Sequence, residues 1–248
     1  MALSPEKFEQ HLATATALKP VYLLAGDEHL LLFEAADALR RRARELGYSE
    51  REVYEAEPGF DGDELARAGA SLALFASRRV IDLRLPTGRP GTEGAAAITA
   101  LLDSPPPDTV LLVTSPTWSK SHETAWVNAL AAVGLVVVYW PLKPHELPDW
   151  IARRATRAGL KLTPDAVGLL VERMEGNLLA AAQEIDKLVL LAQGRALDAG
   201  ALDALVADSA RFDVFRLVDV ALGGETARAV RVIAALRAEG EAVPGLIG

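Results

Sequence analysis

The turn after the first apolar run is where phosphate chemistry would be expected in this sequence. Val21 to Ala25 reads as a buried strand, and Gly26 is followed by Asp27-Glu28-His29 at the start of a helical pattern. A phosphate-binding loop needs a glycine-rich turn, a lysine on the phosphates and a hydroxyl on magnesium. After Gly26 no lysine occurs before Lys120, and the two carboxylates that follow the glycine would repel phosphate. The turn is therefore predicted not to bind a nucleoside triphosphate.

The other residue types that carry enzyme chemistry lack the spacing that the chemistry needs. No serine lies in a G-x-S-x-G elbow, and the apolar run 110–113 is followed by Thr114-Ser115-Pro116 instead of a magnesium-binding carboxylate. No histidine has a histidine partner at helical spacing, and surface positions are expected for His11, His29, His122 and His145. The sequence contains no cysteine. We therefore predict no catalytic residues, no cofactor and no metal.

A second stretch could bind a partner instead of reacting. Residues 71–79, SLALFASRR, follow a helical pattern that opens at Asp61, a good N-cap, and places Leu65 on its apolar face. Leu74 and Phe75 then lie at a helix end. They either plug the junction between helix and sheet or form an exposed apolar contact for a partner. The local pattern by itself favours the junction.

The neighbours of this pair have two interpretations as well. Leu72 continues the apolar face of the helix and is expected to pack inward, whereas Ala73 and Ala76 flank the pair and would add to a contact. Arg78 and Arg79 either pair with carboxylates of a partner or solvate the start of the next strand. Both interpretations of the arginines stay open.

Strand and helix patterns alternate through the first 141 residues. Strands are predicted at 21–26, 51–56, 80–85, 109–114 and 134–140. Helices are predicted from Ser4-Pro5, from 27–29 with a stripe of Leu31, Ala35, Ala38 and Leu39, and over 60–72, 93–102 and 123–133. The loop 86–91 is expected to be rigid and exposed. Because the unbroken apolar strands need cover on both faces, we predict a parallel sheet with helices on each side.

The character of the chain changes after Pro141. Helices are predicted over 144–158, 164–174, 177–192 and 198–206, with no strand among them, which indicates a small all-helical domain. Two more helices, 214–222 and 225–237, are too few for a domain of their own, so this unit is either incomplete or completed by another chain. The predicted domains are 1–141, α/β; 142–210, all-helical; and 211–248, a partial third domain.

Bulk composition limits the function. The chain has 248 residues, half of them apolar, which allows about two domains with real cores. Its formal net charge of -8 argues against nonspecific nucleic-acid binding by the whole surface, although a local basic patch is compatible with it. No signal peptide and no apolar run of membrane-spanning length is present. We expect a soluble, cytoplasmic protein without a membrane partner.

Several motifs in order resemble the delta subunit of the bacterial DNA polymerase III clamp loader. The resemblance extends from about residue 21 to about residue 240. It rests on YLLAGDE at 22–28, SLALFASRR at 71–79, LRLPTG at 83–88, LPDWI at 147–151, EGNLLAAAQEI at 175–185 and DSARFDVF at 208–215. The order and spacing of these motifs are more specific than any one of them.

The resemblance implies an AAA-type fold made of an α/β domain, a helical lid and a helical collar that holds the loader subunits in a ring. It implies a subunit that does not hydrolyse ATP but binds the ring-shaped β sliding clamp and opens it for loading on primed DNA. By position, Leu74 and Phe75 would enter a pocket on the clamp, which reverses the preference for the junction. ATP-binding relatives carry an arginine near Leu179, and its absence agrees with the missing lysine after Gly26.

The implied partners are the β sliding clamp, the ATP-hydrolysing motor subunits, the delta-prime subunit and, through the assembled complex, primed DNA. The parent assembly would be DNA polymerase III holoenzyme, a DNA-directed DNA polymerase and nucleotidyltransferase at the bacterial replisome on the nucleoid. Family members continue into further collar helices, so a truncated end at Gly248 is expected. Two alternatives are a divergent AAA-type ATPase and a DNA-binding replication adaptor that uses the basic run at 40–44.

Overall fold

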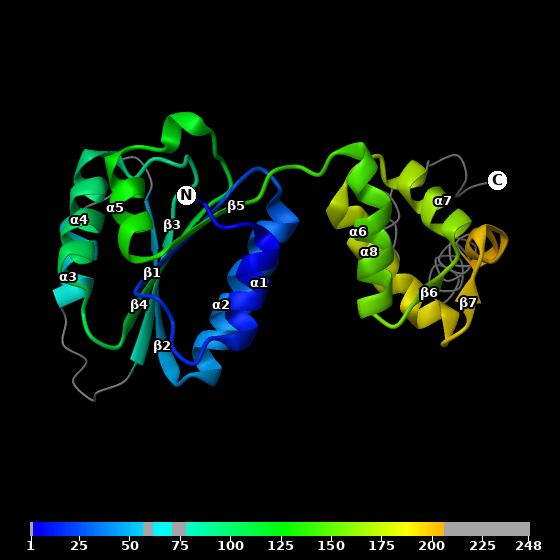
Figure 1. Ribbon diagram of the computed structural model, residues 1–248, viewed down its shortest axis with the longest axis horizontal. Coiled ribbons are helices and arrows are strands. Elements are labelled where there is room, and N and C mark those ends of the chain that lie inside the picture. Colours follow the sequence, from blue (N-terminus) through cyan, green and yellow to red (C-terminus); the bar gives the residue numbers. More distant parts are fainter. Residues whose placement is uncertain (1, 57–61, 71–77, 206–248) are drawn as a thin grey trace, which may run out of the picture. The chain divides into compact units, whose positions relative to one another are not determined.

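The chain forms two compact units, Met1–Leu142 and Lys143–Gly248, in the computed structural model (Figure 1). The structure describes residues 2–56, 62–70 and 78–205. The first unit ends one residue beyond the limit predicted for the α/β domain. The partial domain predicted at 211–248 lies outside the described residues. Among the helices of the described part, none is both long and apolar enough to cross a membrane.

The first unit is built on a five-stranded sheet in which every pairing is parallel. The strand order is β2-β3-β4-β1-β5, so β2, β3 and β4 are neighbours in chain order, whereas β1 lies between β4 and β5. All residues of the two most central apolar strands are buried, which confirms the prediction from their unbroken apolar pattern. The strands are β1 (Val21–Ala25), β2 (Tyr48–Glu55), β3 (Arg78–Arg84), β4 (Thr109–Ser115) and β5 (Leu135–Val138).

Helices cover both faces of this sheet, as predicted. On one face α1 (Pro5–Thr14) and α2 (His29–Glu45) bury Phe8, Leu32 and Leu39. On the other face, α3, α4 and α5 bury Leu65, Ile98 and Leu130 (Figure 1). The bounds of these helices are Gly62–Ala70, Gly91–Asp103 and Ala125–Val133, with a short 3-10 turn, η1, at Lys120–His122 before the last of them. Ser4 caps α1 as predicted, accepting from the Lys7 amide at 3.4 Å.

The buried stripe of α2 differs from the predicted one. The side chains against the sheet are Leu32, Ala36, Leu39 and Ala43, whereas Leu31, Ala35 and Ala38 are only partly buried. The helix has two neighbouring apolar rows. The sheet covers one of them, and the other packs, partly buried, against the edge of the same core. The sequence pattern alone does not separate two such rows, so three of the four predicted residues lie one position before the buried ones, whereas Leu39 is buried as predicted.

The loop 86–91 and His122 are less exposed than predicted. Gly88 and Pro90 are buried, and His122 is only 9% exposed. The His122 ring stacks on Trp118 at 5.2 Å between centroids, and its Nδ1 accepts the Ser119 amide at 2.9 Å. A Cβ on Gly88 would lie 2.9 Å from Nε2 of His122, so the glycine makes room for the ring. Packing between two loops therefore buries a histidine that sequence reasoning placed at the surface.

The second unit is mainly helical, as predicted, but it also contains strands that were not predicted. Its helices are α6 (Leu147–Arg157), α7 (Pro164–Met174) and α8 (Leu178–Ala192), with a 3-10 turn, η2, at Pro144–Glu146 and further helical residues at 199–205. Strands β6 (Lys161–Leu162) and β7 (Ala196–Leu197) form a small parallel pair. Two residues are too few to show strand alternation in sequence, which explains why the pair was missed.

Candidate functional site

The turn after β1 folds back on its own domain. The Gly26 amide donates to the Ser115 carbonyl at 3.0 Å, and the Glu28 amide donates to the Tyr139 carbonyl at 3.1 Å. Gly26 has φ +136°, and a Cβ there would lie 2.0 Å from the Tyr139 carbonyl oxygen. A phosphate at such a turn is held by free backbone amides. Here two of those amides bond to carbonyl groups of the neighbouring strand ends.

The side chains of this turn also face partners within the chain. Asp27 Oδ1 accepts the Trp118 amide at 3.1 Å, and the His29 Nε2 lies 3.0 Å from the Pro116 carbonyl. Burial raises the pKa of Glu28 above its ordinary value. Within residues 2–56, 62–70 and 78–205, no group of three or more acidic, histidine or cysteine side chains could hold a metal. The turn is thus built as a packed junction.

The stretch predicted to bind a partner lies between two described elements. Ala73, Leu74, Phe75 and Ala76 fall outside the described residues. The chain enters this stretch from α3, which ends at Ala70, and leaves it into β3, which begins at Arg78. What the structure defines is how each of these two attachment points is held.

Arg78 holds the start of β3 to three neighbouring segments. Its Nε lies 3.0 Å from Oδ1 of Asp108, just before β4, and its Nη1 donates to the Leu46 carbonyl at 2.9 Å, just after α2. Its guanidinium also lies over the ring of Tyr48 in β2, 5.6 Å from the centroid. The Arg78 side chain is half exposed. It is therefore both a surface residue and the anchor of the strand that follows residues 71–77.

Arg79 points into the domain. The residue is only 4% exposed, its Nη1 lies 3.3 Å from Oε1 of Glu52, and its Nε donates to the Thr109 hydroxyl at 3.3 Å. Its backbone amide bonds to the Asp108 carbonyl at 3.0 Å. Of the two arginines that sequence analysis considered for partner binding, only Arg78 presents its guanidinium at the surface.

The helix that leads into the stretch, α3, is packed against α4. Leu65 of α3 is fully buried in the core, as its place on the apolar face predicted. A Cβ on Gly62 would lie 2.7 Å from the Glu93 carbonyl oxygen, so the start of α3 lies close against the α4 backbone. The predicted N-cap Asp61 and the inward position of Leu72 lie outside the described residues. Both ends of the stretch 71–77 are thus joined to well-packed elements.

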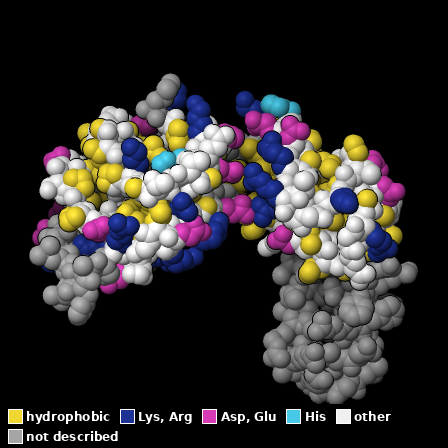
Figure 2. Space-filling view, turned by 60° about the horizontal axis from the view of Figure 1, so that its bottom comes forward, with side chains coloured by type: hydrophobic (Ala, Val, Ile, Leu, Met, Phe, Trp, Pro, Cys, Tyr) yellow, Lys and Arg dark blue, Asp and Glu magenta, His cyan; other side chains and the backbone are white. Residues whose placement is uncertain are grey.

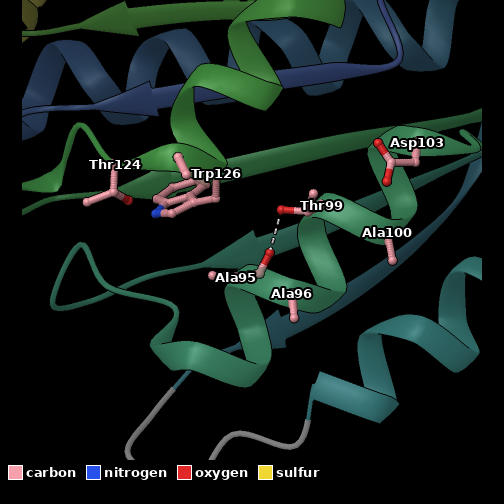
Figure 3. Close-up of a pocket in the computed structure, with 8 residues that line it drawn as sticks. Ala95, Ala96, Thr99, Ala100, Asp103, Thr124 and Trp126 are labelled. Atoms are coloured by element: carbon pink, nitrogen blue, oxygen red, sulfur yellow. Dashed lines mark hydrogen bonds between the residues drawn. The ribbon is translucent and has the colours of Figure 1, made fainter.

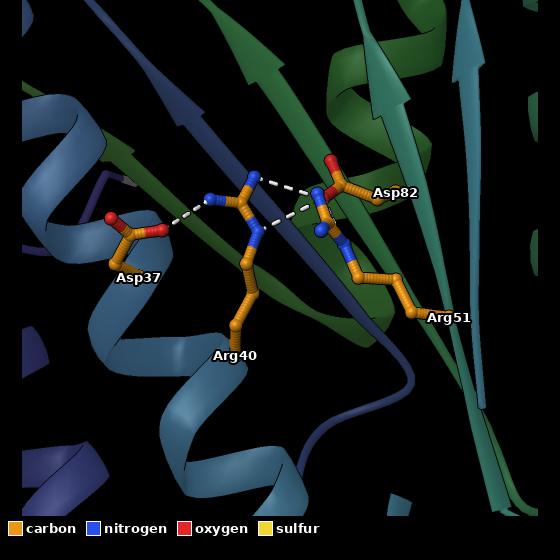
Figure 4. A network of polar contacts seen from close by, with 4 residues as sticks. All are labelled: Asp37, Arg40, Arg51 and Asp82. Atoms are coloured by element: carbon orange, nitrogen blue, oxygen red, sulfur yellow. Dashed lines mark hydrogen bonds and ion pairs between the residues drawn. The ribbon is translucent and has the colours of Figure 1, made fainter. Parts of the chain in front are cut away.

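A buried ion network, which sequence reasoning missed, connects α2 to the strands. Asp82 of β3 is fully buried, and its Oδ2 lies 2.8 Å from Nη2 of Arg40 and 2.6 Å from Nη2 of Arg51 (Figure 4). Arg40 also pairs with Asp37 at 2.7 Å. The Oδ1 atom of Asp82 has no hydrogen-bond partner. The signal in the sequence was Asp82, an acidic residue inside the apolar pattern of β3. A buried charge needs counter-charges, so its position predicts nearby basic side chains.

The network bears on the basic run at 40–44. Arg40 is committed to Asp82, and Arg42 pairs with Glu45 at 2.7 Å and donates to the Ala15 carbonyl at 2.6 Å. Arg41 and Arg44 are exposed. Part of the run that could have contacted DNA is therefore used to hold α2 in the domain.

A hollow on the surface of the first unit lies between α4 and α5 (Figure 3). The Thr99 hydroxyl there donates to the Ala95 carbonyl at 2.8 Å within the helix. Few polar groups converge on the hollow, so its lining does not suggest a reaction. The lining residues are Ala95, Ala96, Thr99, Ala100, Asp103, Thr124, Ala125 and Trp126.

Comparison with solved structures gives the class of fold. The Bacillus subtilis DNA clamp loader delta protein (YqeN) matches with a TM-score of 0.64 at 21% identity, covering 98% of this chain and 75% of that chain. The fold is therefore that of a clamp loader delta protein. The family model for the DNA polymerase III delta subunit also matches, over residues 22–139.

Comparison with curated sequences gives the family. The DNA polymerase III subunit delta of Escherichia coli K12 is 34% identical over 242 residues, which is 96% of this chain and 69% of the relative. The subunit of the same name from Haemophilus influenzae is 28% identical over 241 residues, or 95% and 69% of the two chains. This chain belongs to the DNA polymerase III delta subunit family. The resemblance drawn from the sequence motifs is confirmed.

Proposed function

We propose that this chain is the clamp-opening subunit of a bacterial clamp loader. It binds the β sliding clamp through Leu74 and Phe75 and favours the opened ring, so that the clamp can be loaded on primed DNA. The observation that carries the proposal is the 34% identity to the Escherichia coli subunit along 96% of the chain. The partners proposed with it are the ATP-hydrolysing motor subunits and the delta-prime subunit, within the DNA polymerase III holoenzyme in the cytoplasm.

We further propose that the chain opens the clamp without hydrolysing ATP. The geometry of the turn after β1 supports this, because the amides of Gly26 and Glu28 already bond to Ser115 and Tyr139. No lysine follows Gly26 until Lys120. A protein that prefers the opened interface shifts the opening equilibrium by its differential affinity for the two states, and this needs no hydrolysis by the protein itself.

The size of the proposed contact sets what Leu74 and Phe75 can contribute. Burying each side chain in a partner pocket is worth about 1.5–3 kcal/mol. Micromolar affinity requires about -8 kcal/mol, so the pair cannot supply all of it. We assign additional contacts to Ala73 and Ala76. Arg78, which is half exposed, either pairs with a carboxylate at the rim of the clamp pocket or acts by holding the start of β3. Arg79 is buried, and we assign it a structural role in holding the start of β3.

The test is a calorimetric titration of a bacterial β sliding clamp with the full chain and with the double variant Leu74→Ala, Phe75→Ala. The parent is expected to bind and the double variant to lose most of its affinity while its circular dichroism spectrum stays unchanged. A matched control replaces one exposed leucine and one exposed phenylalanine elsewhere, Leu179→Ala with Phe33→Ala. The control is expected to bind like the parent.

The outcomes separate the parts of the proposal. If the double variant bound as well as the parent, the clamp contact would lie on another surface. If the folded parent did not bind any clamp, clamp binding itself would be wrong. A parallel titration with ATP is expected to give no binding, and saturable binding of ATP would favour the divergent ATPase instead.

A further inference from the structure

The hollow between α4 and α5 has the dimensions of a groove for a helix. Its volume is about 510 Å³, and its lining follows α4 from Ala95 to Asp103 (Figure 3). This length of α-helix spans about 12 Å, a little over two turns. The hollow therefore has room for about two turns of a second helix beside α4. We call it the α4–α5 groove.

The sides of the α4–α5 groove are made of small apolar residues and one aromatic ring. Apolar side chains reach the surface of the first unit in places (Figure 2), and on α4 the exposed ones are Ala96 and Ala100. Such small side chains allow the axis of a second helix to approach to about 8 Å. Trp126 is only 6% exposed, and it contributes to the lining from the start of α5. Grooves of this kind bind the apolar face of an amphipathic helix.

The end of the groove at Asp103 carries a charge that the fold itself does not favour. Asp103 is the last residue of α4, and the last turn of this helix contains no basic residue. The carbonyl groups at a helix C-terminus are partially negative, so a cation stabilises this end and an acidic side chain destabilises it. Asp103 is exposed, and within residues 2–56, 62–70 and 78–205 no side chain forms an ion pair with it.

The helices that form the groove do not offset this negative charge. The charged residues of α4 are Glu93 and Asp103, and α5 has no charged residue. Glu123, two residues before α5, is exposed as well. The phosphate groups of a nucleic acid would be repelled by these carboxylates. The partner that complements the groove in charge is therefore a basic segment of a protein.

We infer that the α4–α5 groove binds a basic amphipathic helix of a partner protein. Apolar side chains of this helix pack on the alanines and on Trp126. A lysine or arginine at its edge pairs with Asp103 and also offsets the carbonyl groups at the end of α4. The site goes beyond the proposed clamp contact, because residues 73–76 are not among those that line it.

The test uses two labelled peptides of about 15 residues, roughly the shortest length at which an isolated helix forms in water. Both carry leucines at i, i+3, i+4 and i+7. One peptide has lysines beside the leucines, and the other has glutamates at the same positions. Fluorescence anisotropy measures the binding of each peptide to the full chain. The lysine peptide should bind, more weakly as salt is raised, and the glutamate peptide should bind at least about tenfold more weakly.

Reversing the charge at the end of α4 separates binding from stability. Asp103→Lys should weaken binding of the lysine peptide about tenfold, because repulsion replaces attraction. The same change should keep or slightly raise the midpoint of thermal unfolding, since lysine suits a helix C-terminus. A purely structural role of Asp103 predicts no loss of binding in a protein that is as stable as the parent. Ala100→Gln, which narrows the groove without a charge, should weaken binding about fivefold or more.

The matched control is Asp186→Lys. Asp186 is exposed on α8 in the second unit, so this variant makes the same change of charge on a helix away from the groove. It should bind the lysine peptide within twofold of the parent. Asp103→Lys should also keep the affinity of the parent for a bacterial β sliding clamp. The peptide titrations themselves do not require clamp binding, so failure of either proposal can be recognised separately.

The inference is wrong if the folded parent does not bind the lysine peptide at low salt. An equal loss of affinity in Asp186→Lys would also overturn it, because binding would then follow net charge. Equal affinity for the glutamate peptide would show that the groove does not select a basic partner. A loss of clamp affinity in Asp103→Lys would assign the groove to the clamp contact and not to a further partner.

Discussion

Arg51 on the edge strand β2 and Asp82 on β3 form the shortest contact of the buried ion network, with Nη2 2.6 Å from Oδ2. Asp82 is fully buried, whereas the side chain of Arg51 is 41% exposed. Arg40 approaches the same oxygen from α2 at 2.8 Å. One carboxylate thus links the edge of the sheet to a covering helix, on the strand that leads away from residues 71–77.

Replacing the central carboxylate should destabilise the first unit. In Asp82→Asn, two arginines lose their shared counter-charge in a partly buried position. Removing one partner of a buried pair costs about 3–5 kcal/mol, and we expect about 3 because Arg51 is partly exposed. The measurement is urea unfolding followed by the fluorescence of Trp118 and Trp126, which both lie in the core of this unit.

The matched control for this variant is Asp37→Asn. Asp37 also pairs with Arg40, at 2.7 Å, but its side chain is 66% exposed. An exposed pair is worth under about 1 kcal/mol, so the control should unfold close to the parent. Equal unfolding midpoints for the two variants would mean that the buried position of Asp82 does not determine the energetics of the network.

The packing of the turn after β1 gives a second prediction. In Gly26→Ala the new methyl group would meet the Tyr139 carbonyl, 2.0 Å away, at a φ of +136°. We expect a loss of about 3 kcal/mol or more in the free energy of unfolding. Gly47→Ala is the control, since φ is +89° there but no atom lies within 4 Å of the added carbon.

Gly47→Ala should lose only the free energy that a non-glycine residue costs at positive φ, about 1–2 kcal/mol. Thermal unfolding by circular dichroism compares the two variants directly. A Gly26→Ala chain as stable as Gly47→Ala would mean that the turn can open away from Tyr139. That result would weaken the argument that its amides are unavailable to phosphate.

Sequence reasoning worked where one pattern had one physical cause. The unbroken apolar runs of β1 and β4 required cover on both faces, and Ser4 before Pro5 set the start of α1. It failed where tertiary contacts made the choice. The two apolar rows of α2 look equivalent in sequence, and only packing against the sheet determines which of them is buried. His122 is buried by the loop at Gly88, 34 residues away in sequence.

In the candidate site, too, the residue types were readable from the sequence but the tertiary contacts were not. The lack of a phosphate-loop lysine was readable from the residues after Gly26, but the amide contacts to Ser115 and Tyr139 were not. Arg78 and Arg79 are adjacent and chemically identical, and only the pleat of β3 sends one outward and the other inward. Sequence alone therefore could not distinguish an anchor at the surface from one inside the domain.

His11 gives a prediction about pH. Burial of the ring, and to a smaller extent the charge of Lys19, lowers the pKa of His11 below its ordinary 6.5. As pH falls below about 6.5, the unfolded chain takes up a proton that the folded chain resists, so stability present above that pH is lost. His11→Gln should remove this part of the decline, at most about 1.4 kcal/mol per pH unit.

The measurement is the free energy of unfolding at about pH 7.5 and pH 5.5, on either side of the ordinary value. His145→Gln, at an exposed position, is the control and should follow the parent curve. If His11→Gln declined as steeply as the parent, the acid sensitivity would arise from other groups. In the folded protein His11 Nε2 lies 2.9 Å from the Tyr22 hydroxyl, and the difference in stability between His11→Gln and the parent at about pH 7.5 measures the loss of that contact.

Arg78 connects the fold to the proposed clamp contact. Its pair with Asp108 is exposed and worth under about 1 kcal/mol to stability, yet it holds the start of β3 next to residues 71–77. If the anchor orders that stretch for binding, Arg78→Ala should weaken clamp binding about tenfold, or about 1.4 kcal/mol, at nearly unchanged stability. Calorimetry with a bacterial β sliding clamp measures the loss, and Arg41→Ala serves as the charge-matched control.

A cycle of variants decides how Arg78 acts. An anchor that works through Leu74 and Phe75 has nothing left to order once these are alanine. Adding Arg78→Ala to Leu74→Ala, Phe75→Ala should then change the residual affinity by less than the single change does. Full additivity would instead mean that Arg78 contacts the clamp independently at the rim. Arg78→Lys separates the two cases further, because lysine keeps the charge but cannot make the forked contacts to Asp108 and Leu46.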